Sequence, residues 1–219
     1  MSQIFNKGAN NIAKASIAGA IILAGLAGLI TTQIARSSWI TGQYLERQQP
    51  VQFSHKHHVG DDGIDCRYCH TAVETSSSAG MPPTQTCMNC HSQIWAESEY
   101  LEPVRASYRD NKPIEWQRVH DLPEYVYFNH SIHVAKGVGC STCHNDVANM
   151  PSVYQANSLQ MEWCLSCHKN PTPNLRPKEE IFNTSYNVGN QSAEEQEKLS
   201  KDYKIRGRAM MTSCSTCHR

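Results

Sequence analysis

The sequence has little of the apolar material from which a protein-only core is built. Of its 219 residues, 39% are hydrophobic and 8% are aromatic, and much of the apolar content lies within residues 1–36. The remainder has no long aliphatic run. A chain of this length forms one ordinary domain or two small ones, so we expect something other than side chains to fill its interior.

An excess of charge of either sign is also missing. The chain has 20 basic and 20 acidic residues, which argues against a nucleic-acid partner and against an extreme surface field. Acidic residues are absent from residues 1–36, which carry Lys7, Lys14 and Arg36. Removing these 3 bases from the 20 leaves 17 bases against 20 acids, so the remainder is slightly acidic.

One uncharged stretch is long enough to cross a membrane. It runs for 21 residues from Ala15 to Ala35, and at about 1.5 Å per residue a helix of this length spans a hydrocarbon core of about 30 Å. A cleaved signal peptide is the alternative, but its apolar region is usually shorter, about 7–15 residues. The basic residues before the stretch predict that the N-terminus is cytoplasmic.

Small residues recur along this stretch at four-residue spacing. They are Ala20, Ala24 and Gly28, and such a stripe lets one helix pack closely against another in lipid. The alternative is that alanine and glycine are merely common in membrane helices. Both interpretations stay open.

Every cysteine of the chain belongs to one repeated motif. The ten cysteines form five Cys-x-x-Cys-His motifs. Two thiols at this spacing reach the two vinyl groups of one haem, and the adjacent histidine becomes its proximal iron ligand. The motifs are Cys66, Cys69 and His70; Cys87, Cys90 and His91; Cys140, Cys143 and His144; Cys164, Cys167 and His168; and Cys214, Cys217 and His218.

Two other uses of paired cysteines fit less well. A zinc ribbon brings two pairs to one metal and does not need a histidine after each pair. A redox dithiol needs one pair and not five. The sequence therefore predicts five covalently bound haem c groups, which are attached on the periplasmic side of the cytoplasmic (inner) membrane.

Histidines outside the motifs decide between an electron carrier and an enzyme. An iron with ligands on both faces only exchanges electrons, whereas an open position can bind a substrate. Six histidines are available, and five of them lie in two segments that share the pattern Val-x-Phe-Ser/Asn-His-x-x-His, residues 51–58 and 126–133. The six are His55, His57, His58, His120, His130 and His133.

The repeated segments indicate two similar modules. Residues 1–36 are predicted to be a cytoplasmic stub and membrane anchor, 37–50 a stalk that begins as helix, and 51–219 the haem domain. Within the haem domain we expect modules at about 51–100 and 120–170, and an extension of loops and short helices at 171–219.

The segment just upstream of the first haem motif in each module resembles the Phe-x-His-x-x-His pattern of class III multihaem cytochromes c. In that class the first histidine caps the haem of the motif that follows, and the second caps a neighbouring haem. The resemblance implies that His55 caps the iron of His70, that His130 caps the iron of His144, and that His58 and His133 reach other haems.

A fifth distal ligand is harder to assign. His120 is the leading candidate because it is the remaining histidine, while His57 is the odd one out in its segment. Met150 and Met161 compete with His120, and a thioether ligand would raise the potential of that haem.

The segments around the motifs carry a more specific resemblance. Residues 63–70 (GIDCRYCH), 82–91 (PPTQTCMNCH), 118–130 (RVHDLPEYVYFNH) and 161–168 (MEWCLSCH) resemble the pentahaem cytochrome c component of alternative complex III. The similarity extends over nearly the whole chain, from the anchor to the final motif.

This resemblance implies a mainly α fold with extensive irregular loops, one N-terminal transmembrane helix and haems as the core. It also implies partners, namely an iron–sulfur subunit, polytopic quinol-binding subunits and a monohaem cytochrome c. The chain would then pass electrons from quinol to a cytochrome c or a terminal oxidase without a substrate site of its own. Two alternatives remain: a stand-alone quinol dehydrogenase that feeds periplasmic nitrate or nitrite reductases, and a multihaem periplasmic reductase.

Overall fold

The computed structural model describes residues 4–218 and divides the chain into two compact units. The first unit ends at Gln43 and the second begins at Tyr44.

The first unit is dominated by helix α1, Ala9–Arg36, in which no residue is buried. The helix begins six residues before the predicted apolar stretch and includes Lys14. Its length and composition suit a membrane-crossing helix, and equally a signal sequence. Thr31 donates its hydroxyl hydrogen to the carbonyl of Ala27 at 2.9 Å, so this polar group is satisfied within the helix, as an apolar environment requires.

A short helix follows α1 in the same unit. Helix α2, Ser38–Thr41, ends at Gly42, whose φ of 70° is in the left-handed region that glycine adopts without strain. Part of the predicted stalk, residues 37–50, is therefore helical. From Tyr44 onward the stalk belongs to the second unit, where the Tyr44 amide donates to the Gln155 carbonyl at 2.8 Å.

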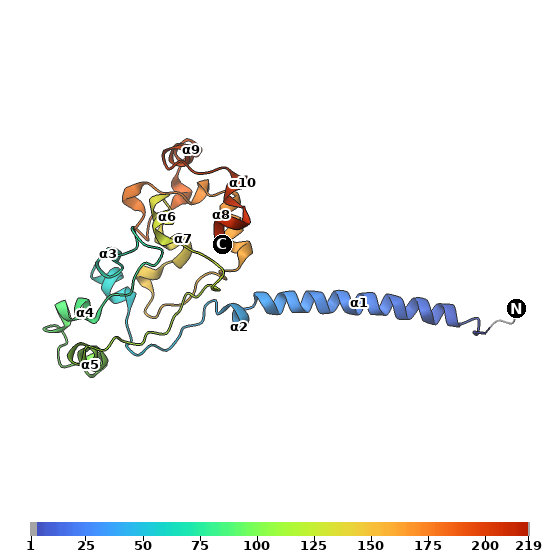
Figure 1. The fold of residues 1–219 in the computed structure, drawn as a ribbon, viewed down its shortest axis with the longest axis horizontal. Helices are drawn as coiled ribbons and strands as arrows, with labels where there is room; N and C mark the ends of the chain where they lie inside the picture. The colour runs from blue at the N-terminus through green and yellow to red at the C-terminus, as the bar shows by residue number, and fades with distance from the viewer. Residues whose placement is uncertain (1–3, 219) are drawn as a thin grey trace. The chain divides into compact units, whose positions relative to one another are not determined.

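The second unit consists of short helices joined by long irregular connections (Figure 1). In the part of the chain that the structure describes, β-structure is limited to two isolated bridges, Glu46 with Tyr154 and Val138 with Leu175. The predicted mainly α fold with extensive loops is confirmed. The α-helices are α3 Cys66–Cys69, α4 Thr84–His91, α5 Glu102–Asp110, α6 His130–Ala135, α7 Cys140–His144, α8 Met161–Lys169, α9 Ala193–Asp202, α10 Arg208–Met211 and α11 Cys214–Cys217.

Single turns of tighter or wider helix complete the unit. The wider one is the π-helix η1, Lys56–Asp61. The 3₁₀ turns are η2 Glu99–Leu101, η3 Val147–Asn149, η4 Thr172–Asn174, η5 Lys178–Glu180 and η6 Val188–Asn190.

The apolar core of this unit is very small. Among the described residues nine apolar side chains are buried, and Leu175 is the large one with no exposed surface. One cluster joins Val73, Val134 and Ile181, with Ala79 and Phe182 packed against it. So few buried apolar residues cannot by themselves offset the conformational entropy lost on folding. The expectation that the interior needs a further component agrees with this observation.

Candidate haem-binding sites

Each Cys-x-x-Cys-His motif forms one turn of helix. The motif makes up the short helices α3, α7 and α11 almost entirely, and it is the C-terminal part of α4 and α8. One helical turn brings residues three apart to the same face, so both thiols of a motif lie on one side. We number the sites in chain order by their motif histidines: site 1 (His70), site 2 (His91), site 3 (His144), site 4 (His168) and site 5 (His218).

In the first module, two upstream histidines face two motif histidines. The ring centroids of His55 and His70 are 6.4 Å apart, and their planes differ by 5°. His58 lies opposite His91, at 6.0 Å and 68°. His55 therefore belongs to site 1, and His58 to site 2.

The second module repeats the arrangement. His130 lies opposite His144, with ring centroids 6.4 Å apart and planes differing by 10°. His133 lies opposite His168, at 6.2 Å and 38°. His130 therefore belongs to site 3, and His133 to site 4.

The spacing of these four pairs fits a haem iron held between two imidazoles. A metal–imidazole bond is about 2 Å long, so two rings that bind opposite faces of one iron through Nε2 have centres about 6 Å apart. A direct stack of two rings would bring their centres closer than this. The four pairs are thus separated by the width that an axially ligated iron requires.

Hydrogen bonds at the other ring nitrogen leave Nε2 available. A carbonyl oxygen can only accept, so an Nδ1 that contacts a carbonyl must carry the hydrogen, and the lone pair for a metal is then on Nε2. Seven histidines have this arrangement, at 2.7–3.0 Å: His58 with Ser54, His70 with Gly80, His91 with Ile94, His130 with Ser77, His133 with Asn129, His168 with Met211, and His218 with Tyr125.

Two histidines of the pairs differ from these seven. The Nδ1 of His144 lies 3.2 Å from Nε2 of His120, so its partner is a side chain. The Nδ1 of His55 is buried and has no hydrogen-bond partner among the described residues.

A phenylalanine holds the two distal histidines of each module. Phe53 meets His55 edge-on at 4.9 Å and stacks on His58 at 4.5 Å. Phe128 meets His130 edge-on at 4.7 Å and stacks on His133 at 4.6 Å. The repeated pattern therefore includes both the phenylalanine and the two histidine rings that it contacts. The repetition of Phe in the sequence could have indicated that it orients these rings.

Burial keeps several of these rings neutral. It lowers the pKa of His55 to about 4, with a further contribution from His70, and it lowers the pKa of His144 to about 3, with further contributions from His120 and His130. Burial also lowers the pKa of His133. Neutral imidazole is the form that binds a metal, so the surroundings favour ligation.

The five sites follow one another in the order 2, 1, 3, 4, 5. Sites 2 and 1 share Phe53. Cys69 of site 1 also lies close to Cys87 of site 2: burial raises the pKa of Cys69, and the nearby Cys87 raises it further. Sites 1 and 3 meet where Cys66 lies close to Cys140, whose contact lowers the pKa of Cys66.

The second half of the row is built in the same manner. Sites 3 and 4 share Phe128, and Cys143 of site 3, whose pKa burial raises to about 12, is close to both cysteines of site 4. At the far end, Cys164 of site 4 lies near Cys217 of site 5. Cys90 of site 2 and Cys214 of site 5 are exposed, so the two ends of the row reach the surface.

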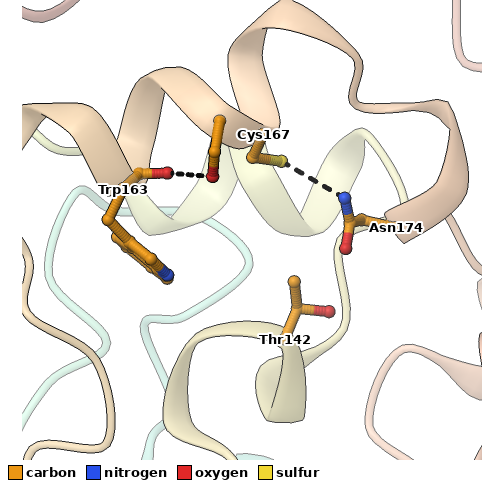
Figure 2. Close-up of a pocket in the computed structure, with 5 residues that line it drawn as sticks. Thr142, Trp163, Cys167 and Asn174 are labelled. Carbon is orange, nitrogen blue, oxygen red and sulfur yellow. Dashed lines mark hydrogen bonds between the residues drawn. The ribbon is translucent and has the colours of Figure 1, made fainter.

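A small cavity lies beside the junction of sites 3 and 4. Figure 2 shows Thr142 of α7 facing Trp163 and Cys167 of α8 across this cavity, which has a volume of about 130 Å³. Asn174 donates toward the Cys167 sulfur at 3.7 Å. Polar and apolar groups therefore both surround a sulfur that would hold the fourth haem.

The candidates for a fifth distal ligand lie in different parts of the structure. His120 contacts His144 of site 3. His57 is exposed, 3.7 Å from Asp62. Met150 is 4% exposed, directly after η3, and Met161 is 66% exposed at the start of α8. The assignment of the fifth ligand stays a prediction.

At site 5 the neighbouring ring is a tyrosine. The centroid of Tyr125 lies 5.8 Å from that of His218, and its carbonyl accepts the Nδ1 hydrogen of the same histidine. In the part of the chain that the structure describes, no histidine ring is paired with His218. Sequence patterns had not indicated this contact.

Helix-borne Cys-x-x-Cys-His motifs whose histidines face a second imidazole define a multihaem c-type cytochrome. The comparisons agree: the chain belongs to the family described as cytochrome c7 and related cytochrome c, which matches residues 51–105 and 126–219. Membership implies covalently bound haem c and a role in electron transfer. Residues 106–125, which include His120, lie between the two matched stretches.

One relative is the "Menaquinone reductase, multiheme cytochrome c subunit" of Nitratidesulfovibrio vulgaris. The two are 32% identical in an alignment 148 positions long, which covers 58% of this chain and 70% of the relative.

Proposed function

We propose that the chain is a five-haem electron-transfer subunit of a quinone-linked membrane complex. The observation that carries this proposal is the set of four histidine pairs with centroids 6.0–6.4 Å apart. A haem held by two imidazoles accepts and donates single electrons and has no position for a substrate. The protein then serves as a conductor and has no catalytic residue.

The geometry of the four pairs and the five motifs support the proposed ligand set. His55, His58, His130 and His133 are the proposed distal ligands, and all ten cysteines form thioethers. The proposed proximal ligands are His70, His91, His144, His168 and His218.

The row of sites supports conduction between two separate partners. Sites 2 and 5 are the ends of the row, and each carries an exposed cysteine, Cys90 and Cys214 respectively. Shared residues such as Phe53 and Phe128 keep successive sites adjacent. We place the docking positions of the electron donor and acceptor at these two ends.

The membrane and partner assignments rest on helix α1 and on the family resemblance. Residues 1–36 would anchor the chain in the inner membrane, 37–50 would connect it, and 51–219 would carry the haems on the periplasmic side. The resemblance to alternative complex III supports an iron–sulfur subunit, polytopic quinol-binding subunits and a monohaem cytochrome c as partners. In such a complex the chain carries electrons away from quinol.

The relative favours a second candidate with the opposite direction of flow. Its printed name is that of a menaquinone reductase subunit, which would deliver electrons to the quinone. The same row of sites serves either direction, since the partners at the two ends determine which end is reduced first.

Haem analysis of the purified membrane complex tests the proposal. The expected result is five haems for each copy of the chain, all of them low-spin, together with polytopic membrane subunits. Oxidation of an added quinol with reduction of cytochrome c supports the first candidate, and reduction of added menaquinone supports the second. A haem count below five, or purification without membrane subunits, would contradict the proposal.

A further inference from the structure

His144 differs from the other motif histidines in what holds its ring. The Nδ1 atoms of the other four contact backbone carbonyls, whereas that of His144 lies 3.2 Å from Nε2 of His120. The two rings meet edge-on, with centroids 4.4 Å apart and planes at 74°. This geometry is that of a hydrogen bond between imidazoles in which one nitrogen points at the lone pair of the other.

We propose that His120 is a positioning residue for site 3, whose Nε2 accepts the Nδ1 hydrogen of His144 and so determines the orientation and basicity of that ring. The proposal rests on the proposed role of His144 as an iron ligand.

Ligand chemistry determines the direction of the hydrogen bond. An imidazole that binds iron through Nε2 carries its hydrogen on Nδ1, so His144 must be the donor and His120 the acceptor. The lone pair of His120 Nε2 is thereby engaged, and that atom cannot also bind another iron. This contact favours a role for His120 at site 3 over the predicted role as the fifth distal ligand.

An imidazole nitrogen is a more basic acceptor than an amide carbonyl. A stronger acceptor draws the hydrogen of His144 away from its ring, which makes the ring a stronger donor to the metal and stabilises the oxidised iron. Site 3 is the middle position of the row, and its two rings, His130 and His144, are within 10° of parallel. The imidazole acceptor distinguishes site 3 from sites 1 and 4 on either side, where His70 and His168 contact backbone carbonyls.

The position of His120 along the chain is consistent with a contact that is not part of the pattern shared by the family. It lies in residues 106–125, outside the two stretches that match the family. The matched stretches carry the five motifs and the four paired distal histidines, and the segment between them supplies the ring that supports His144.

Three variants of the full-length, haem-loaded chain test this proposal: His120→Ala, His120→Asn and the control His57→Ala. His57 is the control because it is an exposed histidine of the first module, where its ring contacts His58 and Trp95 and not site 3. Haem content, the electron paramagnetic resonance spectrum of the oxidised protein and a redox titration are measured for each. Replacement of His130 by alanine identifies the site 3 signal, because that signal then becomes high-spin.

We expect His120→Ala to keep all haems and their spin states, and to raise the midpoint potential of one component, the one identified as site 3. His120→Asn supplies an oxygen acceptor like the carbonyls at the other sites, so we expect a smaller rise than with alanine. The control should leave the site 3 component unchanged, since His57 contacts His58 of site 2.

Three results would overturn the inference. A new high-spin signal in His120→Ala would show that His120 is itself an iron ligand. An unchanged midpoint potential at site 3 would show that His120 does not influence that site. Loss of a haem in both His120 variants would show that His120 has only a structural role, in holding the protein around the haem. Failure of the proposed function itself is recognised separately, by a wild-type haem count below five.

Discussion

The two modules share a sequence pattern but differ in how they hold its histidines. In the second module, the Nδ1 of the first distal histidine, His130, donates to the Ser77 carbonyl at 2.8 Å. The corresponding nitrogen of His55 in the first module is buried and has no partner among the described residues. The second pair of each module differs as well: the ring planes lie at 68° in the first and at 38° in the second.

The backbone that carries the distal histidines explains part of this difference. In the second module they lie on the α-helix α6, whose N-cap residue Asn129 accepts from the amide of Ile132. In the first module they lie at and within the π-helix η1, and the α-carbon of Gly60 in that turn approaches the Ala148 carbonyl. The same short pattern thus supplies two distal rings in each module, while the turn that carries the pattern and the angles between the paired rings differ.

Removal of a distal histidine should have the largest effect. We expect His55→Ala and His130→Ala each to convert one haem from low-spin to high-spin, because each removes one axial ligand, and His57→Ala to convert none. Absorption and electron paramagnetic resonance spectra measure the change. Equal spectra for His55→Ala and His57→Ala would show that site 1 takes a different ligand.

The same spectra would sharpen the comparison of ring angles. The low-spin signal depends on the angle between the two axial rings, so His58→Ala should remove the signal that differs most from those of sites 1 and 3. Loss of a signal indistinguishable from those two would contradict the 68° arrangement at site 2.

Gly60→Ala should produce the next largest effect. The added Cβ would lie 2.8 Å from the Ala148 carbonyl oxygen, so the π-turn or η3 must shift, at a cost of about 1–3 kcal/mol in the free energy of unfolding. Denaturant unfolding of the haem-loaded protein measures this cost.

Gly207→Ala is the control for crowding, since its Cβ would meet nothing within 4 Å. Gly207 is the N-cap of α10, where alanine is less favourable than glycine, so we expect a loss that is smaller than that of Gly60→Ala. An equal effect of the two substitutions would show that the close approach at Gly60 is not tight.

Phe53→Leu and Phe128→Leu should each have a smaller effect on stability. Each loses aromatic contacts to two histidine rings, and such contacts contribute about 0.5–1.5 kcal/mol. We expect the spectra of sites 1 and 2 to change in the first variant and those of sites 3 and 4 in the second. Changes spread evenly over all sites in either variant would argue against two separate modules.

Asn129→Ala should have the smallest effect. It removes the side chain that caps α6. Loss of such a cap costs about 0.5–2 kcal/mol, and we expect the lower end here because the bond to Ile132 is long at 3.4 Å. Ser54→Ala is the counterpart in the first module, where the Ser54 hydroxyl accepts from the His57 amide at 3.2 Å. Thermal unfolding of both variants would compare the caps, and a larger loss for Asn129→Ala than for Gly60→Ala would reverse the expected ranking.

The fold class and the motif-bearing turns could be predicted from the sequence because short patterns encode them. Cys-x-x-Cys-His needs one helical turn wherever it occurs, and the scarcity of apolar residues already indicated a core that side chains do not fill. The resemblance to class III cytochromes predicted the partners of His55 and His130 that the structure brings together.

The remaining features depend on packing between segments far apart in the chain. That His58 meets His91 and His133 meets His168 follows from where α4 and α8 lie. The contact of His120 with His144 joins residues 24 apart, and no local pattern specifies it. The π-turn at Lys56–Asp61 likewise packs against η3, more than 80 residues further along the chain, where Gly60 approaches Ala148.

The nine buried apolar residues found in the described part of the chain have a consequence for how the protein is produced. A chain with so little interior of its own cannot accumulate as a stable precursor, and an unloaded copy is exposed to proteases along most of its length. We therefore expect its abundance in the cell to follow the supply of haem and the capacity for attaching it, even when its messenger RNA is plentiful.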